Sequence, residues 1–314
     1  MPQITILVGP PGAGKSTEAD RLLQAHGHRS DLVRINQDDQ GKEGHMIEFN
    51  LAIAAGDDII IDRMNLNKQQ RNRYLEPARK AGYNTRIIVL HVSKSTCIER
   101  CNARINHPTI KDSISASKAV NFFFNNYERV SNDEAIEVFR LGWVNVKAPK
   151  IIISDLDGTL ANIEHRRHHI RPIVIEDHSD LPHIISVETP KKFKPNWKAF
   201  FEEMIFDTVN DVCRDILNDM SEIYPIIYTT GRPDNYKEQT ENWLMENGLL
   251  FPGSFLFMRA RNDMRKDDVI KQIILDFEIK TRFSVYFVMD DRPSVCRMWR
   301  KNGLMVLQYN DEEF

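Results

Sequence analysis

The stretch Ile4-Thr5-Ile6-Leu7-Val8-Gly9-Pro10-Pro11-Gly12-Ala13-Gly14-Lys15-Ser16-Thr17 decides the fold of the N-terminal half. An apolar strand, a glycine-rich loop of the form GxxxxGK[ST] and the start of a helix follow one another in it, which is the order that a phosphate-binding loop requires. Lys15 would reach the β and γ phosphates of a nucleoside triphosphate, and the Ser16 hydroxyl would hold Mg²⁺. The residues expected at the nucleotide are Gly9, Gly12, Gly14, Lys15, Ser16 and Thr17.

Beyond this loop, polar side chains mark the ends of the next strands. Asp38 lies in the run Asn36–Asp39, just after the expected strand Leu32–Ile35, and its carboxylate could take the proton of an attacking hydroxyl. Asp62-Arg63-Met64-Asn65 ends the third strand and could hold a Mg²⁺-bound water or an acceptor sugar, or could form only a turn. Arg100 and Arg104, four residues apart, would share a helix face and could close a lid over the nucleotide, unless both are simply solvated.

The second half begins with a different strand-to-loop stretch, Ile151-Ile152-Ile153-Ser154-Asp155-Leu156-Asp157-Gly158-Thr159. Two carboxylates two residues apart on an extended segment point the same way. Asp155 could attack phosphorus and form an aspartyl phosphate. Asp157 could protonate the leaving oxygen and then take a proton from water. The DxDGT pattern therefore predicts a phosphatase site.

Three later segments would complete that site. In Thr229–Arg232, Thr230 could donate to a phosphate oxygen and Arg232 could pair with a phosphate of the substrate. Lys266, at the start of a helix, could neutralise the transferring phosphoryl group. Carboxylate oxygens are the ligands that Mg²⁺ prefers. The expected metal ligands of this half are Asp155, Asp157, Asp290 and Asp291.

The alternation of short apolar runs with helical patterns predicts an α/β protein of two domains, 1–147 and 148–314. Each would be a parallel sheet with helices on both faces. The boundary follows an expected helix, Glu134–Leu141, and precedes a new buried strand. The other expected strands are Ile4–Val8, Leu32–Ile35, Ile59–Ile61, Ile87–Val92, Ile151–Ile153, Ile226–Tyr228, Val285–Met289 and Met305–Leu307.

Composition excludes several classes of protein. The chain has 314 residues, 41% hydrophobic and 28% charged, with a net charge of −3, which excludes a disordered or histone-like chain. No apolar run approaches the roughly 20 residues of a membrane span, and no signal-peptide pattern opens the sequence, so a cytoplasmic protein with no membrane partner is expected. Four scattered cysteines indicate neither a disulfide framework nor a zinc site.

The segments DLDGT, TTGR, RKDD and MDDR resemble the four motifs of the haloacid dehalogenase phosphatase superfamily. Together with the N-terminal loop, the whole chain resembles the T-even bacteriophage type of polynucleotide 5′-kinase/3′-phosphatase. The resemblance implies a Rossmannoid phosphatase behind a P-loop kinase. It also implies ATP and Mg²⁺ as cofactors, DNA or RNA ends as substrates, a polynucleotide ligase as functional partner, possible homo-oligomers, and the host cytoplasm if the chain is phage-encoded.

The resemblance also assigns residue roles. Asp38 would be the base for the 5′-hydroxyl, Arg104 the lid arginine, and Arg100 its support. Lys15 and Ser16 would serve ATP. On the phosphatase side, Asp155 would be the nucleophile and Asp157 the general acid. The residues that would complete the phosphatase site are Thr230, Arg232, Lys266, Asp290 and Asp291.

Some features leave alternatives open. The phage family has an arginine that holds the acceptor's 3′-phosphate where this chain has Gly41, followed by Lys42. A small-molecule or nucleoside kinase fused to a nucleotidase or sugar phosphatase would carry the same two motifs, whereas a binding scaffold with inactive sites would be expected to lose them. The insert 161–200 could contact a nucleic-acid strand or be a solvated loop. Its run His165–His169 has no cysteine or acidic partner at a standard metal-ligand spacing, which disfavours a metal site.

Overall fold

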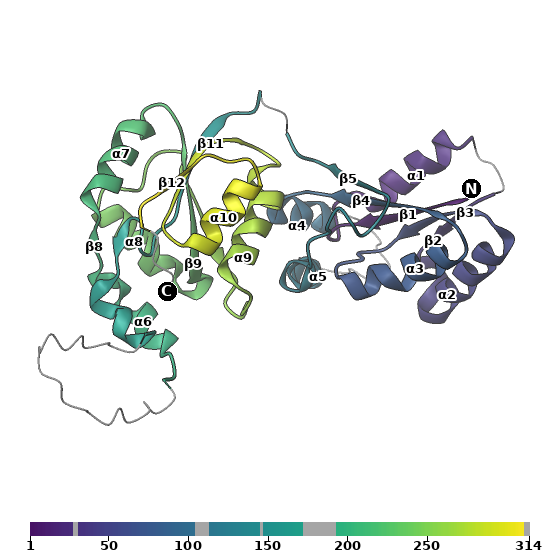
Figure 1. The fold of residues 1–314 in the computed structure, drawn as a ribbon, viewed down its shortest axis with the longest axis horizontal. Helices are drawn as coiled ribbons and strands as arrows, with labels where there is room; N and C mark the ends of the chain where they lie inside the picture. Colours follow the sequence, from purple (N-terminus) through teal and green to yellow (C-terminus); the bar gives the residue numbers. More distant parts are fainter. Residues whose placement is uncertain (28–30, 104–112, 145–146, 172–192, 311–314) are drawn as a thin grey trace, which may run out of the picture. The chain divides into compact units, whose positions relative to one another are not determined.

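The computed structural model describes residues 1–27, 31–103, 113–144, 147–171 and 193–310. It divides into two compact units (Figure 1). The first unit comprises Met1–Lys147 and Leu275–Arg282, and the second comprises Ala148–Ile274 and Phe283–Phe314. The predicted domain 148–314 included the short segment Leu275–Arg282, which instead forms part of the first unit, so the chain passes between the units three times. No helix in the described ranges is long and apolar enough to cross a membrane.

A five-stranded parallel sheet forms the centre of the first unit. Its strands, in spatial order, are β2 (Leu32–Ile35), β3 (Asp58–Asp62), β1 (Gln3–Val8), β4 (Asn84–Leu90) and β5 (Glu137–Leu141). The isoleucine- and valine-rich strands β1 and β3 are buried, as expected for strands covered on both faces. The parallel α/β architecture predicted from the sequence is confirmed here.

The helix predicted over Glu134–Leu141 is wrong, because this stretch contains strand β5. β5 extends the sheet by pairing with β4, so that Val138 lies opposite Ile87 and Arg140 opposite Val89. Strand formation depends on such neighbours more than on local propensity, and neighbours distant in sequence leave no local signal.

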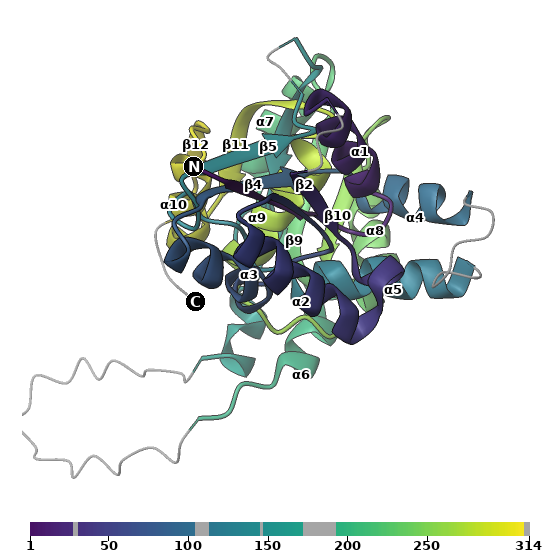
Figure 2. The ribbon, with the colours of Figure 1, turned by 90° about the vertical axis from the view of Figure 1, so that its right-hand side faces the viewer.

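Helices cover both faces of this sheet, with α1 (Lys15–Ala25) on one face and α2 (Gln37–Ala55) and α3 (Lys68–Lys80) on the other (Figure 1). The side chains of Asn36 and Asn67 cap α2 and α3 by accepting hydrogen bonds from free backbone N–H groups. α4 (Lys94–Asn102) and α5 (Ser113–Asn126) lie side by side (Figure 2). α2 is kinked at Gly41, whose φ of 76° is in the left-handed region that favours glycine.

The segment Leu275–Arg282 completes the core of the first unit. Its Phe277 is fully buried, with its ring 5.2 Å from those of Phe124 and Tyr127 and 4.8 Å from that of His91. The neighbouring Asp276 carboxylate accepts a hydrogen bond of 2.6 Å from Arg129 Nε. The segment directly follows helix α9 (Asp267–Ile274), which belongs to the second unit.

We therefore expect Phe277→Ala to destabilise the first unit, although residue 277 follows most of the second unit in sequence. Removing a fully buried phenylalanine ring leaves a cavity and costs about 3–5 kcal/mol. Phe122→Ala is the matched control, because Phe122 is exposed on α5 of the same unit. Hydrogen exchange in α5 peptides should accelerate in F277A and not in F122A; equal exchange in both variants would contradict the assignment of this segment.

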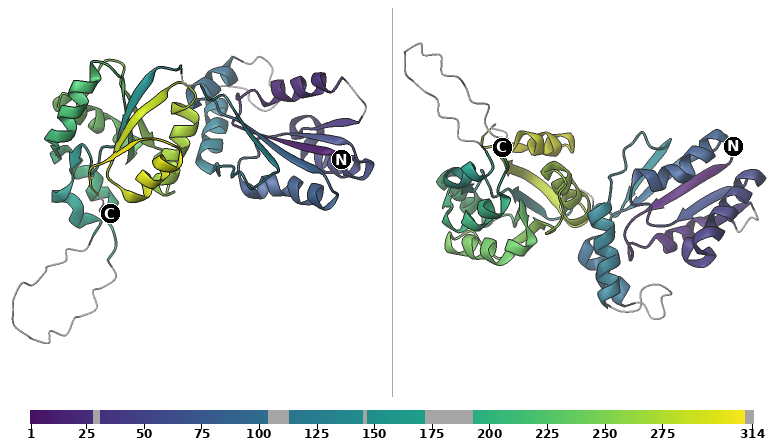
Figure 3. Two further views of the ribbon diagram at one scale, coloured as in Figure 1. Left: turned by 45° about the horizontal axis from the view of Figure 1, so that its top comes forward. Right: turned by 90° about the horizontal axis from the view of Figure 1, so that it is seen from below.

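The second unit is built on another five-stranded parallel sheet. Its strands, in spatial order, are β10 (Phe255–Arg259), β9 (Ile226–Pro233), β6 (Lys150–Ser154), β11 (Ser284–Asp290) and β12 (Val306–Gln308). The sequence predicted four of them, and β10 was missed. α7 (Asp211–Ser221) and α8 (Lys237–Glu246) cover one face, and α9 and α10 (Pro293–Lys301) cover the other (Figures 1 and 3).

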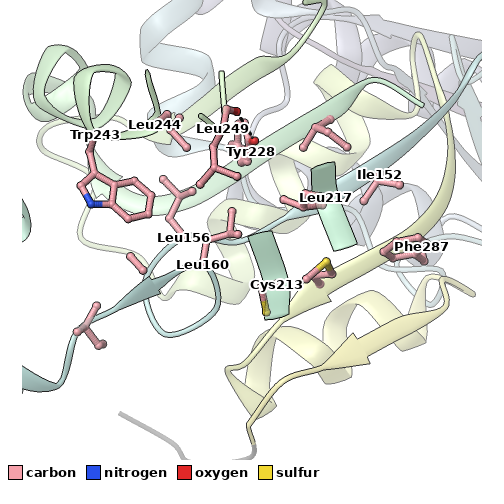
Figure 4. Packing of buried hydrophobic residues seen from close by; sticks show 14 of the residues in the cluster. Ile152, Leu156, Leu160, Cys213, Leu217, Tyr228, Trp243, Leu244, Leu249 and Phe287 are labelled. Atoms are coloured by element: carbon pink, nitrogen blue, oxygen red, sulfur yellow. Dashed lines mark hydrogen bonds between the residues drawn. The ribbon is translucent and has the colours of Figure 1, made fainter. Parts of the chain in front are cut away.

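The main core of this unit lies between the sheet and helices α7 and α8. Ile152, Tyr228 and Phe287 from three neighbouring strands pack with Leu217 of α7 and Trp243 of α8 (Figure 4). This core fixes the central strand β6, and therefore also the loop that follows it with Asp155 and Asp157.

The described parts of the insert pack beside that loop. β7 (Ala161–Asn162) pairs antiparallel with β8 (Thr208–Val209). Between these strands lie the 3₁₀ turn η1 (Glu164–His169), helix α6 (Trp197–Glu202) and the 3₁₀ turn η2 (Glu203–Phe206). This small cap brings residues on both sides of the gap 172–192 to the same edge of the sheet as Asp157.

Candidate active sites

In the first unit, the glycine-rich loop joins the central strand β1 to helix α1. Gly12 has a φ of 82°, and a Cβ there would lie 2.5 Å from the carbonyl oxygen of Cys97. Only glycine therefore fits at this position. Lys15 Nζ donates a hydrogen bond of 2.8 Å to the carbonyl oxygen of Pro10, so its ammonium group lies across the loop. The loop has the form of a phosphate cradle at the N-terminus of a helix.

The other predicted nucleotide residues surround this loop. Ser16 and Thr17 are exposed on the first turn of α1. Arg100 lies on α4 with Nη1 3.5 Å from the carbonyl oxygen of Gly12, which brings its guanidinium to the loop. Arg104 lies outside the described residues. The hydroxyls of the first turn and the Arg100 cation are thus available to a bound nucleotide.

The edge beside the loop holds the candidate acceptor residues. Asp38 is exposed on the first turn of α2, with its backbone N–H capped by the Asn36 side chain. Asp62 is buried and bound by Arg34, whose Nη2 lies 2.5 Å from Oδ2, so its carboxylate is already engaged. Arg34 was not predicted from the sequence. Arg63, which lies in the predicted run Asp62–Asn65, contacts the side chains of Gln37, His45 and Tyr74 through its guanidinium.

In the second unit, three buried carboxylates converge at the ends of neighbouring strands. Asp155 follows β6, and Asp290 and Asp291 follow or end β11, with one carboxylate oxygen of each residue within 4.8 Å of the others. This all-oxygen donor set suits Mg²⁺. The carboxylate of Asp157, a predicted fourth ligand, is not part of the cluster, because it is held by two arginines as described below.

The three clustered carboxylates share one buried lysine, Lys271, while Arg259 and Arg292 pair with the nearby Asp267. Lys271 Nζ lies 2.6 Å from Asp155 Oδ1, 2.9 Å from Asp290 Oδ2 and 3.5 Å from Asp267 Oδ2. Burial, added to the negative charges of Asp290 and Asp291, raises the pKa of Asp155 well above its usual value despite Lys271. Burial and Asp290 raise the pKa of Asp291 to about 6. A divalent cation would offset this excess of negative charge.

Lys271, and not the predicted Lys266, contacts the carboxylate cluster. Lys266 precedes α9 and is exposed, whereas Lys271 is fully buried on the helix face that packs on the sheet. Asp267 and Lys271 are four residues apart and so share this face. Ile270, Ile273 and Ile274 are buried around the lysine. These isoleucines were the sequence signal that could have placed Lys271, rather than Lys266, on the buried face of α9.

Beside the carboxylate cluster, two buried arginines hold two aspartates. Arg166 Nη2 lies 2.6 Å from Asp157 Oδ1 and 2.5 Å from Asp207 Oδ2. Arg232 Nη2 lies 2.6 Å and 3.0 Å from the same two oxygens. Burial opposes ionisation, but Arg232 and Arg166 hold the pKa of Asp157 well below its usual range. Arg232 was predicted from the sequence as a phosphate-binding residue. Arg166 was noted only as part of the basic run His165–His169, and no nearby sequence pattern pointed to Asp207.

The TTGR turn connects this arginine network to the carboxylate cluster. Thr230 is fully buried, and its hydroxyl oxygen accepts a hydrogen bond from the backbone N–H of Arg232. A Cβ at Gly231 would lie 2.8 Å from Asp267 Oδ1, so a side chain there would push into the cluster. Asp155, Asp157, Thr230 and Arg232 thus meet in one place, together with Lys271 and Arg166.

Comparisons with known proteins match each half to a family model. Residues 197–314 match the polynucleotide kinase PNKP phosphatase domain, and residues 4–120 match the AAA domain. The DxDGT loop, Asp155–Thr159, lies before residue 197, where the phosphatase match begins. The assignment of this loop to the phosphatase site therefore depends on the contacts of Asp155 and Asp157.

The chain is also similar to individual proteins. The chain is 25% identical to a putative bifunctional polynucleotide kinase/RNA ligase of Autographa californica nuclear polyhedrosis virus, over 95% of this chain and 41% of that protein. It is 32% identical to Transcription factor bHLH140 of Arabidopsis thaliana over 33% of this chain and 12% of that protein. The chain thus spans less than half the length of these curated relatives. The structure of the Pnkp1/Rnl/Hen1 RNA repair complex aligns with 100% of this chain and 97% of the matched chain at 21% identity, with a TM-score of 0.41.

Proposed function

We propose that this chain, which joins an AAA-domain unit to a phosphatase domain of the polynucleotide kinase PNKP family, prepares broken DNA or RNA ends for ligation. The first unit phosphorylates 5′-hydroxyl ends with ATP, and the second unit removes 3′-phosphates. The observation that supports this proposal is the combination, in one chain, of two groups of residues that suit phosphate chemistry. One is the Lys15 loop, which suits a nucleotide donor, and the other is the buried cluster around Asp155, which suits hydrolysis.

In the kinase reaction, the loop N–H groups and Lys15 hold the phosphates of ATP, and Asp38 accepts the proton of the attacking hydroxyl. Ser16 would hold Mg²⁺, which neutralises charge on the phosphates. Arg63 would supply the cation for the acceptor phosphate that Gly41 cannot supply; its guanidinium contact with Gln37, beside Asp38, supports this role. Arg100 would bind the nucleotide from α4, beside the loop, and the sequence predicts that Arg104 acts with it.

In the phosphatase reaction, an Asp155 carboxylate oxygen attacks phosphorus, and the bond to the ribose or deoxyribose oxygen breaks. Asp157 gives that oxygen a proton, then takes one from the water that cleaves the aspartyl phosphate. Mg²⁺ at Asp155, Asp290 and Asp291 would neutralise the phosphoryl oxygens. Lys271 holds Asp155 in place for attack and adds a positive charge.

The arginine network explains how Asp157 can be an acid although its pKa is low without substrate. A substrate phosphate would compete with Asp157 for Arg166 and Arg232. Once the guanidinium groups turn toward that phosphate, burial of the Asp157 carboxylate favours its protonated form. Binding of substrate would then supply the acid that the reaction needs.

We expect Arg166→Ala to lower phosphatase kcat/KM by about 100-fold, because one of the two phosphate-binding cations is removed. Arg167→Ala is the control: its neighbouring guanidinium pairs with Glu164, outside the network. Steady-state kinetics on a 3′-phosphorylated oligonucleotide measure both variants. If R166A and R167A lose activity equally, Arg166 has no special role at the phosphate.

A single substrate tests the proposed function. An oligonucleotide with a 5′-hydroxyl and a 3′-phosphate is incubated with the protein, Mg²⁺ and labelled ATP, as DNA and as RNA. We expect the 5′ end to gain label and the 3′ end to lose phosphate. Transfer to mononucleosides or sugars without transfer to either oligonucleotide would refute the proposal in favour of a metabolic kinase and phosphatase.

The proposal extends to a partner. The baculovirus relative is named as a polynucleotide kinase/RNA ligase, and this chain covers only part of its length. A polynucleotide ligase would consume the 5′-phosphate and 3′-hydroxyl ends that the two reactions produce. Assembly into homo-oligomers and action in the cytoplasm, of the host if the chain is phage-encoded, belong to the same proposal.

A further inference from the structure

The structure brings together a group of side chains that the reactions above do not use. His168 and His169 of η1 lie beside Glu203, the first residue of η2, and one potential ligand atom of each lies within 4.8 Å of the others. The sequence disfavours a metal site at these histidines, because no cysteine or acidic residue lies at a standard metal-ligand spacing from them. Folding of the cap supplies an acidic partner from beyond the gap 172–192.

Two contacts suit a metal ion bound by this group. His168 Nδ1 lies 2.9 Å from the carbonyl oxygen of His165, and a bond donated there leaves Nε2 unprotonated and free to ligate. His169 Nε2 is shielded from solvent and lies 2.9 Å from Glu203 Oε1, so the two atoms are close enough to bind one ion.

We propose that His168, His169 and Glu203 bind one transition metal ion, with Zn²⁺ the best match to two imidazoles and a carboxylate. Imidazole nitrogen disfavours Mg²⁺, so this site differs in chemistry from the all-carboxylate cluster at Asp155. A water molecule would fill the fourth position. The inference goes beyond the proposed end-healing function and does not depend on it.

A metal ion at this site would connect η1 and η2, the two 3₁₀ turns that position Arg166 and Asp207. η1 carries Arg166, and Asp207 follows η2 directly. Arg166 binds Asp207 through both Nε and Nη2, at 2.6 and 2.5 Å. A metal ion shared by His168, His169 and Glu203 would link the same two turns on their outer side. Its effect would therefore be structural, holding Arg166 beside Asp157.

Metal binding to the full chain tests the inference directly. The protein is stripped with a chelator, given excess Mg²⁺ to fill the carboxylate cluster, and titrated with Co²⁺, which absorbs strongly in the visible when it is tetrahedral with nitrogen ligands. We expect one equivalent to produce that absorption and Zn²⁺ to displace it. Zn²⁺ should also raise the melting temperature, because it binds only the folded chain.

Three variants locate the site. His168→Ala and Glu203→Gln should each weaken Co²⁺ binding at least about tenfold and abolish the Zn²⁺ shift in melting temperature. Glu202→Gln is the matched control, because Glu202 is the exposed sequence neighbour that pairs with Lys198 instead. His168 is exposed, so its removal should leave the fold intact, as circular dichroism would verify. No saturable absorption, or binding equal in all variants, would overturn the proposal and leave an ion pair only.

Discussion

Asp155→Asn should abolish 3′-phosphatase activity and leave 5′-kinase activity unchanged. The amide cannot form the acyl phosphate, so we expect a loss of roughly a thousandfold or more, the range found when a covalent nucleophile is removed. The substitution should not unfold the second unit. Burial and the neighbouring carboxylates already raise the pKa of Asp155, so its ionised form is costly in the fold, and Lys271 retains Asp290 and Asp267 as partners.

Lys15→Ala provides the reciprocal variant. It removes the ammonium group that lies across the phosphate loop and should abolish the kinase by a comparable factor while sparing the phosphatase. Both activities are read at once on the oligonucleotide with a 5′-hydroxyl and a 3′-phosphate. A D155N protein that still releases phosphate at the parent rate, or that also loses kinase activity, would contradict two independent sites.

The second large effect is expected from Lys271→Met. This change removes the cation buried among Asp155, Asp267 and Asp290, so that Asp155 and Asp290 lose their buried ammonium partner. Asp267 still pairs with Arg259 and Arg292. Breaking such a buried pair costs about 3–5 kcal/mol of folding free energy. Phosphatase activity should fall by roughly a thousandfold, because Asp155 loses its positioning contact and the phosphoryl group loses a positive charge.

Lys266→Met tests whether Lys271, as the structure indicates, or Lys266, as the RKDD motif predicts, is the lysine that acts in the phosphatase reaction. Lys266 is exposed, so its loss should change stability by less than about 0.5 kcal/mol. Urea unfolding monitored with and without Mg²⁺ adds a second measurement. The ion should restore part of the stability of K271M, since it replaces the missing positive charge, and should affect K266M as it does the parent. A K266M protein without phosphatase activity would restore the original assignment.

The sequence identified those parts of the sites that lie within one strand-to-loop unit. The Lys15 loop and the Asp155–Thr159 loop each follow a buried strand directly, and their residue spacing alone determines which groups point outward. The parallel sheets were also predictable, because continuous isoleucine and valine runs indicate strands covered on both faces.

The parts that the sequence did not predict depend on contacts between distant segments. Lys271 rather than Lys266 faces Asp155 because α9 begins at Asp267 and turns its apolar face to the sheet. Arg166 contacts Asp157 through the fold of the cap, in which Asp207 also binds the Arg166 guanidinium. β5 requires β4 as a neighbour before its residues form a strand rather than a helix.

The placement of Leu275–Arg282 has a consequence for synthesis of the protein on the ribosome. N-terminal domains usually fold while the rest of the chain is still being made. Here the first unit must wait for Phe277, so its core stays open until most of the second unit has been translated. The two units then complete folding at nearly the same time. A ribosome that stalls before this segment would release a chain with an unfinished kinase unit, and the two activities should appear together during translation rather than one after the other.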